Sequence, residues 1–317
     1  MKKALVLLNM GGARNKSELE LFLKNMFNDN NILTIKSDFL RWILASLIVF
    51  SRTNSAWKNY ELIGSRSPIN PLTQKLVSKL QNAISDIYIT HAMRYTPPFA
   101  IDCIKNLEDK NIEDVILLPL YPQYSTTTTK SSVEEFVELS KGKFNLNIIK
   151  PFYKNTLFNN LILEEIFSKI VNKDYDNYDL VFSAHGLPQK IVDDGDPYQI
   201  HLEEQLEILK NKLSSKNIKF KSISLAYQSK VGPLPWLKPS LDDRLKELQN
   251  SKSVIIYPIS FIIDNSETDF ELDIEYREIA QECNIKEFIV CKCPNHSNSF
   301  INVIFDLINY QSCSNID

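Results

Sequence analysis

Residues Asp179–His185 read DLVFSAH, a short apolar run that ends in a histidine. Short buried strands that alternate with helices are typical of βαβ units. Runs of the same kind, rich in valine and isoleucine, recur with longer helical patterns between them at Lys3–Asn9, Asp86–His91, Asp114–Leu120, Asn145–Lys150, Lys221–Gln228, Ser253–Ser260 and Glu287–Lys292. The sequence therefore predicts an α/β fold with parallel strands.

The runs form two sets that meet near residue 150. Each set contains a strand that ends in Tyr-Pro, at Tyr121-Pro122 and at Tyr257-Pro258, with polar residues after it. This repeat predicts two similar halves, residues 1–150 and residues 151–317. Open α/β sheets bind ligands beyond the carboxyl ends of their strands, so the residues after each run are the candidates for a site.

The composition narrows the class of protein. Of 317 residues, 44% are hydrophobic and 24% are charged, which excludes a disordered chain. Lysine plus arginine (36) against aspartate plus glutamate (39) leaves a net charge of −3, so we expect no nucleic-acid partner. No glycine-rich phosphate loop follows a strand. Five cysteines, no signal sequence and no apolar stretch of about 20 residues predict a cytoplasmic protein with reduced thiols.

His185 is the first candidate for chemistry. It stands at a strand end, before Gly186, where the chain must turn. A histidine in such a place is suited to proton transfer near neutral pH or to binding a transition metal. The alternative is a structural histidine that is bonded to a neighbouring carbonyl, and the position alone leaves both open.

A row of carboxylates follows another strand. Glu267, Glu271 and Glu275 recur every four residues, so on a helix they line one face, with Asp264 about one turn earlier. Like charges at this spacing repel each other and destabilise a helix unless cations or hydrogen-bond donors compensate for them. The row is therefore either a solvated acidic face or a route for cations.

The segment Phe39–Phe50 (FLRWILASLIVF) is the most apolar in the chain. Core packing is the default interpretation. The alternative is an apolar lip that lies in a bilayer interface without spanning it. Rings, a thioether and arginines also follow several strands, at Met10, Arg94, Tyr95 and Trp236, and would suit a flat apolar ligand that is edged by carboxylates.

Together these segments resemble ferrochelatase, the enzyme that inserts ferrous iron into a porphyrin in haem synthesis, over nearly the whole chain. The matching segments are LLNMGG from Leu7, IGSRSPIN from Ile63, MRY from Met93, YPQYS from Tyr121, FSAHGLP from Phe182, GDPY from Gly195, QSKVGPLPWLKP from Gln228 and ETDFELDIEY from Glu267. The resemblance implies two Rossmann-like domains of the chelatase type, each with a four-stranded parallel sheet flanked by helices. It implies that the final helix packs back on the first domain.

The resemblance also implies a porphyrin cleft in which His185 faces Glu267 as the catalytic pair and as the metal ligands. Glu271, Glu275 and Asp264 would form an acidic path for metal or protons. The residues 39–50 would be a membrane-facing lip, on an enzyme that is otherwise cytoplasmic or peripheral on the inner face of the cell membrane. The residues that would bind the porphyrin are Met10, Arg52 (near a propionate), Tyr60, Ser67, Arg94, Tyr95, Ser125, Trp236 and Phe261.

Three positions distinguish this chain within the family. Asn265 stands where many relatives carry a histidine, which removes a second imidazole from the acidic side. Gly186 replaces the serine that is common after the catalytic histidine, which we expect to be a minor change. Met10 is typical of members that use protoporphyrin, whereas relatives that use coproporphyrin tend to have tyrosine there. The expected substrates are therefore protoporphyrin IX and Fe(II).

Some relatives carry a 2Fe-2S cluster, and four thiolates could hold one here: Cys283, Cys291, Cys293 and Cys313. The alternative, which we favour, is that these thiols are small buried or terminal side chains and that no cofactor beyond the substrate iron is required. Two other functions compete with protoporphyrin ferrochelatase. One is a chelatase for coproporphyrin III, another tetrapyrrole or another metal, and the other is a porphyrin or haem carrier without turnover.

Overall fold

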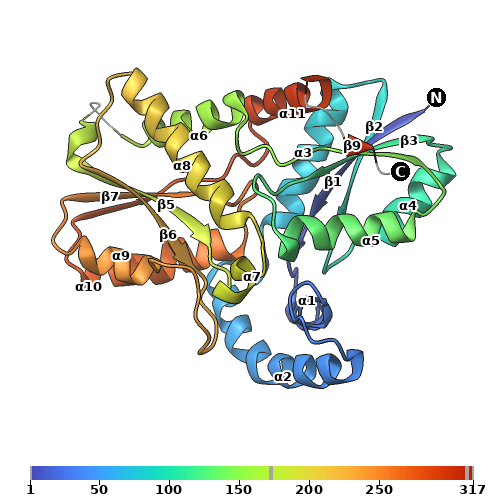
Figure 1. Cartoon of the computed structure of the whole chain (residues 1–317), viewed down its shortest axis with the longest axis horizontal. Helices are drawn as coiled ribbons and strands as arrows, with labels where there is room; N and C mark the ends of the chain where they lie inside the picture. Colours follow the sequence, from blue (N-terminus) through green and yellow to red (C-terminus); the bar gives the residue numbers. More distant parts are fainter. Residues whose placement is uncertain (1, 171–173, 311–313, 316–317) are drawn as a thin grey trace. The chain divides into compact units, whose positions relative to one another are not determined.

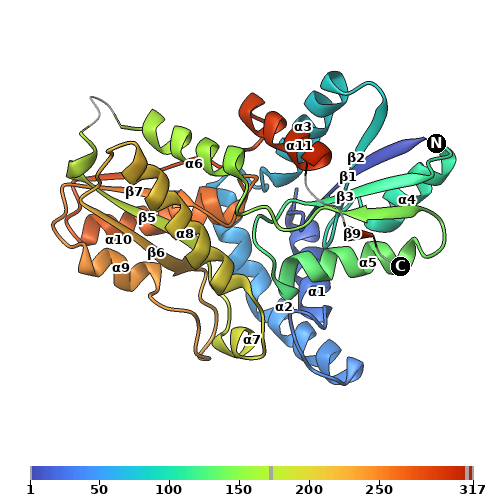
Figure 2. The same cartoon turned by 45° about the horizontal axis from the view of Figure 1, so that its top comes forward.

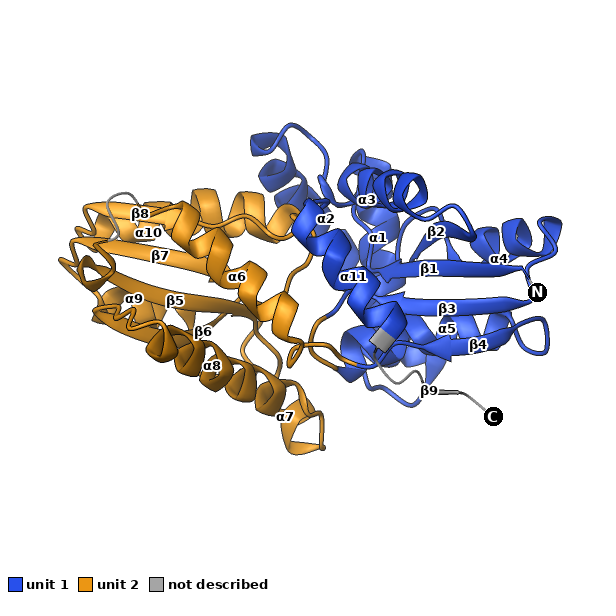
Figure 3. Ribbon diagram, turned by 90° about the horizontal axis from the view of Figure 1, so that it is seen from above, with its two compact units in different colours: residues 1–121, 125–150, 296–317 blue, residues 122–124, 151–295 orange. Residues whose placement is uncertain are grey.

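A computed structural model describes residues 2–170, 174–310 and 314–315 of the chain. They form two compact units, which Figure 3 shows in different colours. Unit 1 comprises Met1–Tyr121, Ser125–Lys150 and His296–Asp317, and unit 2 comprises Pro122–Tyr124 and Pro151–Asn295. The units thus differ from the predicted halves in two places, because residues 122–124 belong to unit 2 and residues 296–317 belong to unit 1.

Unit 1 contains a sheet of the order β2-β1-β3-β4-β9. Its four main strands are parallel, and β9 (Ser314–Asn315) pairs antiparallel with β4 at the edge. The main strands are β1 (Lys3–Asn9), β2 (Ile87–Met93), β3 (Asp114–Pro119) and β4 (Asn145–Ile148). The helices are α1 (Lys16–Asn28), α2 (Asp38–Leu62), α3 (Ile69–Ala83), α4 (Ala100–Asp109), the π-helix η1 (Thr126–Lys130), α5 (Ser131–Leu139) and α11 (Asn298–Tyr310).

Two apolar clusters hold unit 1 together. Alternate side chains of β1 pack with α4 and α5, as in the contacts among Val6, Ile104 and Phe136. A separate cluster joins α1 to α2 through Leu23, Phe27 and other side chains. Asn15 and Ser37 cap the two helices by accepting backbone N–H groups with their side chains. The pair α1 and α2 is thus a small subdomain of unit 1 with its own apolar contacts.

Unit 2 contains a four-stranded, all-parallel sheet of the order β6-β5-β7-β8. Its strands are β5 (Tyr178–His185), β6 (Ser222–Gln228), β7 (Ser253–Pro258) and β8 (Glu287–Val290). The helices are α6 (Thr156–Ser168), the 3₁₀ turn η3 (Tyr175–Asn177), α7 (Gln189–Asp193), α8 (Tyr198–Ser215), α9 (Leu241–Glu247), the π-helix η4 (Glu267–Glu275) and α10 (Tyr276–Glu282).

Helices cover both faces of the sheet in unit 2. Figures 1 and 2 show α6 and α8 on one side of β5 and β7, with α9 and α10 on the other. The second side is a buried cluster that includes Val181 of β5, Leu241 of α9 and Leu272 of η4. This packing places the π-helix against the carboxyl end of the sheet.

The predicted α/β fold is confirmed. Each of the predicted strand runs forms a strand at nearly the predicted bounds, in two sheets with four parallel strands each. The short β9 is an addition that the sequence pattern did not indicate. Within the described residues, no helix combines the length and the apolar character that crossing a membrane requires.

Candidate active site

The backbone of His185 is fixed on both sides at the end of β5. Its N–H donates to Ser260 Oγ (3.0 Å), and its C=O accepts the Tyr198 hydroxyl (3.0 Å). The ring nitrogen Nδ1 lies 2.6 Å from the carbonyl oxygen of Gly186. Because a carbonyl only accepts, Nδ1 carries a proton, and Nε2 is the nitrogen that can exchange a proton or bind a metal.

Gly186 has no side chain, which allows the backbone of Gln228 and the indole of Trp236 to lie close beside it. A Cβ at this position would lie 2.8 Å from the backbone oxygen of Gln228 and 3.1 Å from the indole of Trp236. The exchange of serine for glycine is therefore more than a minor change in this chain, since a side chain would force the backbone apart. The indole of Trp236 lies against this glycine, and the ring of Phe261 is 6.5 Å from the ring of His185.

Glu267 is the carboxylate closest to the histidine. Its Oε1 lies 3.5 Å from His185 Nε2, and the two side chains are 28% and 35% exposed respectively. Asn265 fixes the start of the π-helix, because its Oδ1 accepts the backbone N–H of Glu267 (2.7 Å). The second carboxylate oxygen, Oε2, is buried and has no hydrogen-bond partner among the described residues. A buried acceptor without a donor is costly, so a donor or a cation that reaches Oε2 would be stabilised there.

The acidic row lies on a π-helix rather than on an α-helix. In this wider turn, η4, Glu271 accepts hydrogen bonds at Oε2 from Gln228 and Ser229, whereas Glu275 at the far end is exposed. Burial and the charge of Glu267 raise the pKa of Glu271 to about 7. The row therefore runs from two half-buried carboxylates to an exposed one, and only its outer end is a solvated acidic face.

The carboxylates also set the charge of the histidine. Burial opposes the imidazolium of His185, but the charges of Glu267 and Glu271 outweigh burial and raise the pKa of His185 to about 9. Near neutral pH, His185 is thus protonated and paired with Glu267. A metal that binds at Nε2 must displace this proton.

We expect metal binding at pH 8 to release about one proton from His185, because the imidazole is still largely protonated there while Glu271 is largely ionised. The release should vanish as the pH rises above about 9, where the imidazole is already neutral. Calorimetric titration of Fe(II) without oxygen, in two buffers of different ionisation enthalpy, measures this number. His185→Ala should lower it by about one at pH 8, and an unchanged number would contradict this assignment.

The carboxylate of Asp264 forms its hydrogen bonds with the loop after β8 and not with the acidic row. Its Oδ1 accepts the backbone N–H of Cys293 (3.0 Å), and its Oδ2 accepts Nδ2 of Asn295 (2.8 Å). Lys292 lies 4.0 Å from the same carboxylate. These contacts fasten the loop after β8, and the structure does not bring Asp264 into a hydrogen bond with Glu267 or Glu271.

The cysteines of the predicted cluster are enclosed by the protein. Cys283, Cys291 and Cys293 are buried, and burial raises the pKa of the thiols of Cys291 and Cys293 well above the ordinary value. Cys313 lies outside the described residues. Among the described residues, no group of three or more histidine, cysteine or acidic side chains is arranged to hold a metal.

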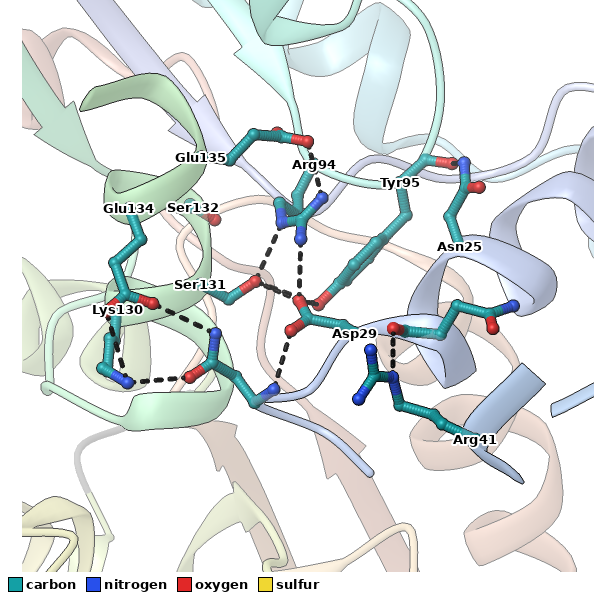
Figure 4. Close-up of polar contacts among 12 residues, drawn as sticks. Asn25, Asp29, Arg41, Arg94, Tyr95, Lys130, Ser131, Ser132, Glu134 and Glu135 are labelled. Carbon is teal, nitrogen blue, oxygen red and sulfur yellow. Dashed lines mark hydrogen bonds and ion pairs between the residues drawn. The ribbon is translucent and has the colours of Figure 1, made fainter. Parts of the chain in front are cut away.

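Arg94 and Tyr95 belong to a polar cluster in unit 1 (Figure 4). The guanidinium of Arg94 donates to Asp29 (3.0 Å), Glu135 (2.7 Å) and Ser131 (2.9 Å). The hydroxyls of Tyr95 and Ser131 donate to the same Asp29 oxygen, and the Asp29 side chain is 1% exposed. The sequence analysis missed Asp29, whose side-chain partners Arg94, Tyr95 and Ser131 are 65 or more residues away along the chain. All three donor nitrogens of Arg94 are thus engaged within the protein.

The other residues of unit 1 that were predicted to bind the porphyrin lie on different elements of that unit. Met10 follows β1, and its carbonyl accepts the N–H of Tyr95. Tyr60 is buried at the end of α2, where its ring stacks on Trp57, and Arg52 is half-buried on the same helix. Ser67 is buried beside Gly12, and Ser125 caps the π-helix η1.

Comparison with known proteins agrees with the motifs. A family model described as ferrochelatase matches residues 2–312. The chain is 53% identical to a ferrochelatase of Sulfurimonas denitrificans, over 96% of this chain and 98% of that protein. It is 43% identical to a ferrochelatase of Helicobacter pylori, over 97% of this chain and 92% of that protein.

The chain belongs to the ferrochelatase family. The resemblance seen in the sequence is thus confirmed, and as a ferrochelatase the chain is a lyase-class metal chelatase. Among solved structures, SirB from Bacillus subtilis with Fe3+ is similar, with a TM-score of 0.59, 11% identity and coverage of 98% of this chain and 96% of that chain. At this identity the likeness to SirB shows a shared fold only.

Within this ferrochelatase, the structure brings five of the predicted site residues together in unit 2: His185, Glu267, Glu271, Trp236 and Phe261. The sequence analysis did not single out the polar residues that hold them, among them Ser183, Tyr198, Gln228 and Ser260. One signal was available, because Ser183 interrupts the apolar run Leu180–Ala184 of a buried strand. A hydroxyl in such a place indicates a buried partner.

Proposed function

We propose that this enzyme inserts Fe(II) into protoporphyrin IX and releases the two pyrrole protons. The observation that carries the proposal is the pair of His185 and Glu267, with one imidazole nitrogen and one buried carboxylate oxygen left for a reacting group. Metallation requires a base for the pyrrole protons and ligands that accept a partly dehydrated cation. The pair offers both, because the end of β5 and the start of the π-helix η4 bring the two side chains within 3.5 Å of each other in unit 2.

In this proposal four residues, His185, Glu267, Glu271 and Glu275, handle the metal and the protons. Fe(II) would displace the proton from His185 Nε2 to water, and the carboxylate of Glu267 would accept the two pyrrole protons one after the other and pass each of them on along the row. Glu271, with a pKa of about 7, can accept and release a proton near neutral pH. Glu275 is exposed at the end of the row, where protons or hydrated metal exchange with water. Trp236 and Phe261 would contact the macrocycle beside the histidine.

Anaerobic incubation with Fe(II) and protoporphyrin IX, followed by the loss of porphyrin fluorescence, tests the proposal. Formation of haem supports it. A protein that binds the porphyrin but never metallates it, with coproporphyrin III and other divalent metals also tried, would be a carrier. A higher kcat/KM for coproporphyrin III than for protoporphyrin IX would overturn the substrate assignment, which rests on Met10 after β1.

We also propose that residues 39–50 contact a phospholipid surface. Most apolar side chains on this part of α2 are exposed, whereas Ala45 and Val49 are buried in the cluster with α1 and Ile48 packs against it. Phe39 and Trp42 stack on each other at 6.4 Å. The exposed fractions are 68% for Phe39, 57% for Leu40, 52% for Trp42, 62% for Leu47 and 88% for Phe50. Exposed apolar area of this kind supports a peripheral attachment to the cell membrane.

We expect the double variant Leu47→Ser, Phe50→Ser to weaken binding to phosphatidylglycerol-containing vesicles by about 10-fold or more, because each buried apolar side chain contributes about 1.5 kcal/mol or more. Co-sedimentation measures the bound fraction. Ile101→Ser, on α4, removes a side chain that is also 50% exposed and should leave binding unchanged. Equal binding of the parent and the double variant would contradict the membrane contact.

A further inference from the structure

A serine and a glutamine are buried in unit 2 behind the carboxylate of Glu271. Ser183 (0% exposed) lies on β5, and Gln228 (1% exposed) is the last residue of β6. Side chains two residues apart in a strand share a face, so Ser183 lies on the same side of the sheet as His185. Gln228 pairs with His185 in the register of the sheet. The mechanism proposed above uses neither side chain.

The two residues form a directed chain of hydrogen bonds. Ser183 Oγ donates to Gln228 Oε1 (2.8 Å), and Gln228 Nε2 donates to Glu271 Oε2 (3.1 Å). An ionised carboxylate only accepts, so the amide must turn its nitrogen toward Glu271 and its oxygen toward Ser183. The serine hydroxyl satisfies that oxygen and locks the amide in this orientation. A reversed amide would place its oxygen against the carboxylate.

This series of hydrogen bonds leaves one carboxylate oxygen of Glu271 without a donor. Gln228 and Ser229 both donate to Oε2, and Oε1 accepts no hydrogen bond among the described residues. Glu271 is thus anchored by one oxygen and presents the other, one turn of the π-helix from Glu267. Within DLVFSAH, the serine has its hydrogen bond to Gln228 to offset the cost of burying a hydroxyl.

We propose that Ser183 and Gln228 are positioning residues for metal delivery, which hold Glu271 so that its free oxygen receives the incoming cation before Glu267 and His185. This inference rests on the proposed function. It assigns to the buried pair an effect on the metal substrate and none on the porphyrin. Hydrogen bonds to charged groups are strong enough for their loss to be visible in kinetics.

The test compares Ser183→Ala, Gln228→Met and the double variant with the parent enzyme, in anaerobic assays with Fe(II) and protoporphyrin IX. Gln228→Met should raise the KM for Fe(II) by about tenfold, the equivalent of one lost hydrogen bond to a carboxylate. Ser183→Ala should raise it too, by up to the same factor, because it releases the amide that donates to Glu271. Both single variants should leave the KM for protoporphyrin unchanged. Ser224→Ala is the matched control. Ser224 lies on the same face of β6, and its hydroxyl accepts Arg244 Nε (3.0 Å), away from Glu271.

The double variant separates positioning from stability. Each single change leaves a buried polar group without its partner and should lower the Tm, whereas the double change removes both groups and should recover part of the Tm. We expect the KM for Fe(II) to stay high in the double variant. If that KM returns to the parent value together with the Tm, the pair is structural only and the inference is overturned.

The outcomes distinguish this inference from the proposed function. If the parent does not metallate a porphyrin, the proposed function fails. If the parent is active and both single variants keep the parent KM for Fe(II), the positioning role alone fails. A raised KM for protoporphyrin with an unchanged KM for Fe(II) would also overturn it, because the effect would then lie on the wrong substrate.

Discussion

Glu267→Gln is expected to lower kcat for iron insertion by about 10²- to 10⁴-fold, the range for loss of a general acid or base. Glutamine keeps the size of the side chain but can neither take a proton nor balance the charge of a cation beside His185. His185→Ala should cause a loss of similar size. Because the two groups act as a unit, the double variant should be scarcely slower than either single variant. Anaerobic initial rates of haem formation measure each effect.

Binding of the porphyrin provides the internal check on these variants. Quenching of tryptophan fluorescence by protoporphyrin should give nearly the parent Kd, since neither change removes an apolar contact. Glu278→Gln is the matched control, because this exposed carboxylate lies on α10 directly after the π-helix. It should keep kcat within about twofold of the parent. A Glu267→Gln enzyme with more than a tenth of the parent kcat would show that Glu267 is not central.

Asp29→Ala is expected to lower the free energy of unfolding by about 3–5 kcal/mol, the cost of breaking a buried ion pair from one side. The carboxylate is 1% exposed and accepts Arg94, Tyr95 and Ser131 together (Figure 4). Its removal leaves two hydroxyls and part of a guanidinium without an acceptor in the interior of unit 1. Urea unfolding followed by circular dichroism measures the loss as a lower midpoint.

Glu108→Ala supplies the comparison for this effect. Glu108 pairs with Lys143 at 3.0 Å, but the side chains are 44% and 37% exposed, so the pair contributes less than about 1 kcal/mol. A midpoint for Asp29→Ala that matches the midpoint for Glu108→Ala would mean that the buried cluster does not stabilise unit 1. Arg94→Met should lower the urea midpoint by a similar amount to Asp29→Ala, because it leaves the buried carboxylate of Asp29 without its cationic partner.

The strands and the central histidine could be predicted from the sequence because both depend on local patterns. An apolar run such as DLVFSAH specifies a buried strand, and the position after it specifies the carboxyl edge of the sheet. The π-helix could not be predicted, since the spacing of Glu267 and Glu271 fits an α-helix equally well. The side chains that bond to Asp29 and Gln228 are tens of residues distant, and no local pattern indicates such contacts.

The two sheets share the strand order β2-β1-β3-β4 and β6-β5-β7-β8, and in both units the third strand leads through a loop into a π-helix. The match extends to register, because Leu8 pairs with Pro119 in one sheet and Ser183 pairs with Pro258 in the other. The two units therefore repeat one arrangement of strand, loop and π-helix, but the π-helix of unit 2 carries glutamates where that of unit 1 carries threonines. The repeated backbone frame alone thus does not supply the acidic row, which depends on the side chains that stand on only one of these two π-helices.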